Sequence, residues 1–94
     1  MAKSVETAEI VALQALGWLM GNDDLRDVFL GSSGLTATDL RASATQPEFL
    51  ASVLDFMLLN DAWIIGFCDA VGLEYDRVRQ ARAALPGGEA VHWT

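Results

Sequence analysis

The feature that most constrains the fold is a set of helix-start and helix-stop signals that occurs twice. Asn-Asp at residues 22–23 and Gly-Leu at 34–35 return 38 positions later, at 60–61 and 72–73. Acidic residues are favourable in the first turn of a helix, and Gly followed by an apolar residue is typical of a Schellman-type helix end. The signals therefore enclose one short helix in each half, and we assign structural capping roles to Gly34, Leu35, Gly72 and Leu73.

Apolar residues at helical spacing fill the segments between these signals. They predict helices over residues 5–20, 23–33, 46–59, 61–71 and 75–85, and a further short helix that starts at Thr36. Capping boxes at Thr36–Asp39 and Thr45–Glu48 mark two of the helix starts, and Pro47 suits a first turn. No stretch alternates strictly between apolar and polar residues as a half-buried strand does. The prediction is an all-α, compact bundle of about five to six short helices. The duplication would make it two pseudo-symmetric three-helix units, unless it reflects only the similarity of amphipathic helices.

Composition and charge limit the class of protein. The chain has 94 residues, of which 52% are hydrophobic, so we expect one helical domain over residues 1–85, followed by a flexible tail over 86–94. Thirteen acidic residues against six basic ones give a net charge of −7, which disfavours nucleic acids and acidic membranes as partners. No apolar run is long enough to span a bilayer, and a lone cysteine suits a reducing compartment. We therefore expect a soluble, cytoplasmic, acidic protein.

A combination of short motifs resembles a known family. The motifs are Phe29-Leu30, Gly34-Leu35, Asp39-Leu40-Arg41, Pro47-Glu-Phe-Leu50, Val53-Leu-Asp-Phe56, Phe67 and Ala81-Arg82-Ala-Ala-Leu85. Together they resemble a small alphaproteobacterial family catalogued as domain of unknown function 3572, over about residues 8–85. The resemblance implies a short, helical, bacterial cytoplasmic protein, and it implies no particular activity.

The chain offers few residues for catalysis or metal binding. His92 is the only histidine and lies in the predicted tail, so a Ser-His or Cys-His pair would depend on it. Cys68 is surrounded by apolar residues in the sequence, where a thiol behaves as a small hydrophobe. The three acids Asp23, Asp24 and Asp27 lack the spacing of a calcium loop and suit a helix start better. We expect a protein that is not an enzyme and that has no cofactor or metal.

One charged residue interrupts an apolar helix. Asp55 lies within Val53–Leu59, on the narrow polar strip of the predicted helix over residues 46–59. A solvated position on that strip is one interpretation. The other is an ion pair with Arg41, because the preceding helix would form an antiparallel hairpin with this one. An Arg–carboxylate pair would fix how the two helices cross.

The leading functional hypothesis is a protein-interaction module that self-associates. The predicted helix over residues 61–71 is apolar on nearly every side, and its candidate partner surface consists of Trp63, Ile64, Ile65 and Phe67. A small domain that cannot bury such a helix exposes a patch that a partner covers, most often a second copy in a homodimer. The competing interpretation makes this helix the central one of the bundle.

Two other functions are open at the sequence level. Residues 67–81 imitate a helix-turn-helix, and the helix over 74–85 would then present a nucleic-acid face made of Arg77, Arg79, Gln80 and Arg82. The net charge and the acids at the start of that helix oppose this alternative. The second alternative is a binder of small apolar ligands within the bundle, which composition cannot distinguish from ordinary packing.

Overall fold

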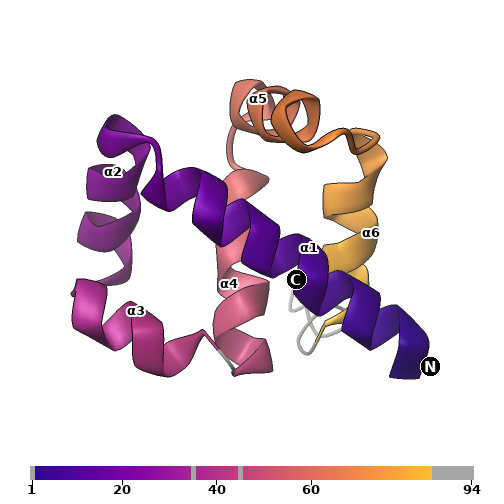
Figure 1. Ribbon diagram of the computed structural model, residues 1–94, viewed down its shortest axis with the longest axis horizontal. Helices are drawn as coiled ribbons and strands as arrows, with labels where there is room; N and C mark the ends of the chain where they lie inside the picture. Colours follow the sequence, from indigo (N-terminus) through magenta and orange to yellow (C-terminus); the bar gives the residue numbers. More distant parts are fainter. Residues whose placement is uncertain (1, 35, 45, 86–94) are drawn as a thin grey trace, which may run out of the picture.

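The computed structural model describes residues 2–34, 36–44 and 46–85 (Figure 1). The side chains of residues 2–4, 33, 37 and 41 are also outside the described set. The described residues form six helices and no strand, which confirms the all-α prediction: α1 (Ala2–Met20), α2 (Asp23–Ser33), α3 (Ala37–Ser43), α4 (Pro47–Met57), α5 (Asp61–Val71) and α6 (Asp76–Ala84). α1 begins earlier than the predicted start at residue 5. The predicted tail over residues 86–94 lies outside the described residues.

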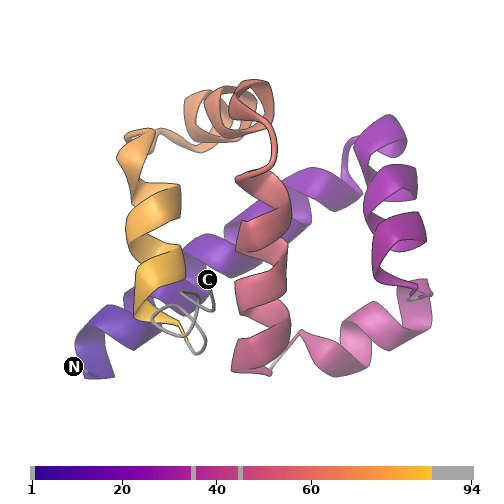
Figure 2. The same cartoon turned by 180° about the vertical axis from the view of Figure 1, so that it is seen from behind.

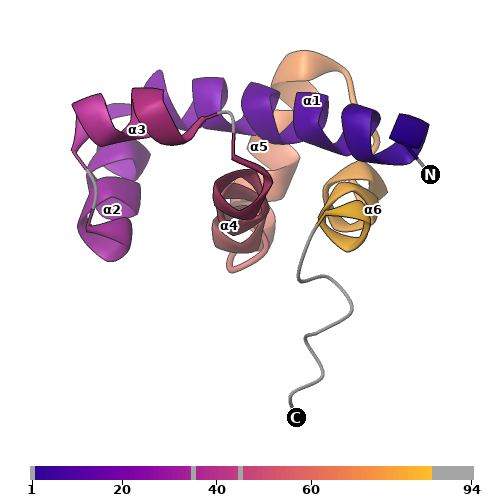
Figure 3. The ribbon, with the colours of Figure 1, turned by 90° about the horizontal axis from the view of Figure 1, so that it is seen from below.

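The helices form a row that one long helix crosses. α2, α4 and α6 lie in the row, and the neighbouring helices α4 and α6 run in opposite directions (Figures 1 and 2). α1 crosses the row on one side, as the view from below shows (Figure 3). α5 lies across one end of α4 and α6, and α3 connects α2 to α4 at the other end. The most extensive contacts of α1 are with α6 and α4.

Small side chains allow α1 to approach the row closely. Ala8, Ala12 and Ala15 lie on its inner face and are buried. Residues three and four apart share one side of a helix, so the three alanines form a shallow ridge against which neighbouring helices can pack. The space between α2 and α4 is filled instead by aromatic rings, since the centroids of Phe29 and Phe56 lie 5.1 Å apart in an edge-to-face arrangement.

The two halves of the chain share their signals but do not pack alike. α1 has 19 residues and crosses the row, whereas its counterpart α4 has 11 residues and lies within the row. α1 packs mainly against α4 and α6 of the other half, while α4 packs against α1 and, less extensively, against α6 of its own half. The repeated sequence therefore specifies the same order of helices in each half, and the tertiary contacts differ.

The capping predictions can be checked at three helix ends. Gly34 and Gly72 both have left-handed backbone angles, with φ values of 74° and 77°. At the second of these ends, the N–H groups of Gly72 and Leu73 both donate to the carbonyl oxygen of Cys68, which includes the long bond of a Schellman motif. Thr36 and Asp39 form the predicted reciprocal capping box. Leu35 and Thr45 lie outside the described residues.

The left-handed angle at Gly72 predicts opposite effects for two Gly→Ala substitutions. Gly72→Ala should lower the free energy of unfolding by about 1 kcal/mol, because an L-residue is strained at φ 77°. Gly31→Ala should raise it by about 0.5 kcal/mol, because alanine is the better helix former. Gly31 is exposed within α2, and a Cβ placed there would meet no atom within 4 Å apart from its chain neighbours and the nearby backbone of α2. Urea unfolding of both variants measures the difference, and equal effects would contradict the capping role.

Candidate functional site

The predicted partner surface on α5 is largely inside the protein. Phe67 has no exposed area, and only 8% of Ile64 is exposed. Trp63 is partly buried, because its ring stacks on Phe56 with 4.8 Å between the centroids. Of the four predicted residues only Ile65 is exposed. The prediction of a partner surface on α5 is corrected accordingly, because the largest side chains of α5 pack against the end of the bundle.

Contacts with α1 explain why α5 turns this side inward. The ring of Phe67 lies 6.1 Å from that of Trp18, measured between centroids. A Cβ placed on Gly66 would lie only 3.1 Å from the Trp18 ring, so the glycine allows the two helices to approach. The apolar character of α5 therefore reflects burial on one side, while Ile65 and Val71 remain exposed beside Asp61 and Asp69.

Part of the exposed side of α1 is apolar, and the sequence did not single it out as a partner surface. Ile10 is 57% exposed and Leu13 is 44% exposed, although both lie in the middle of the longest helix. Gly17 is also exposed and lies one helical turn beyond Leu13. We call Ile10, Leu13 and Gly17 the outer face of α1. The signal was present in the sequence, since residues 10–22 contain no charged residue.

The side chains of the predicted nucleic-acid face point in different directions. Arg79 is exposed and forms an ion pair with Asp76 on the same helix, with 2.8 Å between nitrogen and oxygen. The side chain of Arg82 is only 16% exposed and contacts α4. Arg77 is half-buried, and Gln80 is exposed beside it. The geometry therefore divides the four residues between an ion pair, an interhelical contact and a groove.

Asp55 has a partner that the sequence did not predict. Its Oδ1 lies 2.5 Å from Nε of Arg82, so the pair joins α4 to α6. The side chain of Arg41 lies outside the described residues, and its pairing with Asp55 stays a prediction. α4 lies beside α6 in the row, which makes a residue from the end of the chain a neighbour of Asp55.

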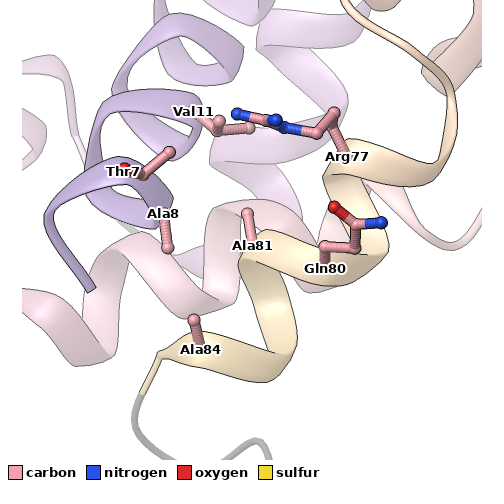
Figure 4. Close-up of a pocket in the computed structure, with 7 residues that line it drawn as sticks. All are labelled: Thr7, Ala8, Val11, Arg77, Gln80, Ala81 and Ala84. Carbon is pink, nitrogen blue, oxygen red and sulfur yellow. The ribbon is translucent and has the colours of Figure 1, made fainter. Parts of the chain in front are cut away.

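A groove lies between the first half of α1 and α6. It encloses about 380 Å³, and Ala8 and Val11 line it from α1 while Ala81 and Ala84 line it from α6. Figure 4 shows the side chain of Arg77 directed across the groove toward Val11. We call this feature the α1–α6 groove.

Cys68 does not behave as a reactive thiol in this fold. It is buried, and its Sγ donates to the carbonyl oxygen of Glu74 at 3.6 Å. Burial raises the pKa of the thiol, and the nearby charge of Asp69 raises it further. The described residues contain no group of three His, Cys, Asp or Glu side chains that could hold a metal ion, and His92 lies outside them.

Comparison with protein families identifies the group of proteins to which the chain is related. Residues 5–88 match the sequence model of the family described as "Protein of unknown function (DUF3572)". The chain belongs to this family. No curated protein matches it, and no solved structure does.

The DUF3572 match includes every element of the candidate sites. The outer face of α1, the α1–α6 groove and the Asp55–Arg82 pair all lie within residues 5–88. No single helix among the described residues combines the length and hydropathy needed to cross a membrane. α4 and α5 reach those values only as a pair, and the chain bends by 111° between them.

Proposed function

We propose that this member of the DUF3572 family is a non-catalytic, cytoplasmic interaction module that self-associates through the outer face of α1. The observation that supports the proposal is the exposure of Ile10 and Leu13 within residues 10–22 of the chain, a segment that contains no charged residue. In the described chain the inner side of α1 is buried against α4 and α6, while the outer face has no cover.

A second copy of the chain suits this face. In a two-fold dimer the same surface meets itself, so one apolar strip supplies both halves of the interface. Gly17 would allow the two helix backbones to come close, because a Cβ placed there would meet no atom within 4 Å apart from its chain neighbours and the nearby backbone of α1. Each copy has a net charge of −7, so we expect the association to strengthen with salt, which screens the repulsion between copies.

The size of the face limits the affinity. Stable interfaces bury about 800 Å² on each partner, and a single helix face provides less than that. We therefore expect a weak dimer with a Kd in the micromolar range or above.

Sedimentation velocity over a concentration series tests the proposal. The wild-type chain should sediment as a monomer when dilute and as a dimer when concentrated. Ile10→Lys should raise the concentration at the midpoint of dimerisation by at least about ten-fold, because each copy would then bury an unpaired charge. Val28→Lys is the matched control, since Val28 is 50% exposed on α2 and the two substitutions change the net charge equally. A wild-type chain that stays monomeric, or equal shifts for both variants, would contradict the proposal.

A further inference from the structure

The α1–α6 groove combines an apolar floor with polar groups at its rim. Ala8, Val11 and Ala81 are buried within the protein and form the floor, with Ala84 at the end of α6 extending it. Arg77 crosses one end of the groove, and the side-chain amide of Gln80 lies on the same wall (Figure 4). A volume of about 380 Å³ is within the range of pockets that bind small molecules.

Arg77 differs from the other described arginine side chains in its surroundings. Arg26, Arg79 and Arg82 each form an ion pair with an aspartate. Arg77 forms none with any described carboxylate, although the chain has more than twice as many acidic as basic residues. Arg77 is half-buried, and its guanidinium lies over an apolar surface. This position favours binding of an anion, because a charge-assisted hydrogen bond is stronger where water is partly excluded.

We infer that the α1–α6 groove binds a small apolar carboxylic acid, a function separate from self-association through the outer face of α1. The carboxylate accepts hydrogen bonds from the guanidinium of Arg77 and the amide of Gln80. The hydrocarbon part lies along the alanines of the floor, and the removal of its own apolar surface from water contributes to binding.

Charge and shape select this class of ligand over others. One unpaired cation matches one carboxylate, whereas a ligand with several phosphates would meet the repulsion of a chain with net charge −7. An apolar amine would place its positive charge beside Arg77. The small side chains of Ala8, Ala81 and Ala84 leave room along the floor for an unbranched hydrocarbon chain.

NMR titration of the full chain with octanoate tests this inference. Octanoate, kept below its micelle concentration, should shift the amide resonances of Ala8, Val11, Gln80 and Ala84, with a Kd on the order of a millimolar for so small a ligand. Hexanoate should bind about four-fold more weakly, because two CH₂ groups fewer would be half buried. Arg77→Gln should weaken octanoate binding about ten-fold, because it removes the positive charge of the guanidinium that donates to the carboxylate.

Three controls decide the outcome. Arg79→Gln removes an equal charge two residues away, on an arginine already paired with Asp76, and should leave octanoate binding unchanged. Octylamine has the same hydrocarbon chain and should not bind. The spectrum of Arg77→Gln without ligand shows whether this variant is folded. If it is unfolded, Arg77→Lys takes its place; this substitution keeps the charge and should retain part of the affinity. The inference is overturned if octanoate causes no shifts, if octylamine causes the same shifts, or if Arg79→Gln weakens binding as much as Arg77→Gln. None of these outcomes depends on whether the chain dimerises.

Discussion

Replacement of Phe67 by alanine should lower the free energy of unfolding by about 3–5 kcal/mol, the usual cost of removing a buried aromatic ring. Phe67 has no exposed area and contacts the ring of Trp18. A domain of this kind is stable by only about 5–15 kcal/mol, so the variant should be close to unfolding at room temperature. Urea unfolding followed by circular dichroism measures the loss.

Ile65→Ala is the matched control on the same helix. Ile65 is 43% exposed, so its substitution should cost roughly 1 kcal/mol, well below the cost at Phe67. The comparison separates the two interpretations of α5. A Phe67→Ala variant that keeps its stability and loses only self-association would show that α5 is a partner surface after all.

The Asp55–Arg82 pair should be coupled by about 1.5 kcal/mol in a double-mutant cycle made with Asp55→Asn and Arg82→Gln. Only 16% of the Arg82 side chain is exposed. Loss of the Asp55 carboxylate therefore weakens the compensation of a positive charge that water only partly solvates. The exposure of Asp55, 56%, keeps the expected coupling below that of a fully buried pair.

The Asp76–Arg79 pair is the control for this cycle. It joins the same two residue types, but both side chains are more than 60% exposed and lie on one helix. Its coupling should not exceed about 0.5 kcal/mol. A third cycle with Arg41→Gln tests the pairing that the sequence suggested. If Asp55 couples to Arg41 and not to Arg82, the contact between α4 and α6 contributes little to stability.

Local signals explain why the helices could be predicted. Gly34 and Gly72 end α2 and α5 because their left-handed angles are accessible to glycine at no steric cost. Thr36 and Asp39 satisfy N–H groups at the start of α3. Each of these effects acts within four residues, so one sequence is sufficient to recognise it.

The buried side of a helix and the ion-pair partner of a charged residue could not be predicted in the same way. Phe67 was assigned to the surface because α5 is apolar on nearly every side, and composition does not indicate which side meets Trp18. Asp55 was paired with the preceding helix because hairpins are the simplest contact, whereas α6 is its neighbour in space. The α1–α6 groove is lined by residues about 70 positions apart in the sequence, and no local pattern indicates such a contact.

The crossing of α1 over the row has a consequence for how the chain folds during synthesis. α6 is the helix that α1 contacts most extensively, and it emerges from the ribosome after the other five described helices. Until residues 76–84 have emerged, the alanine ridge of α1 lacks its main cover, and contacts between segments so distant in sequence form slowly. A nascent chain that stops after α5 would therefore expose part of the inner side of α1 in addition to its outer face, which favours aggregation or capture by a chaperone.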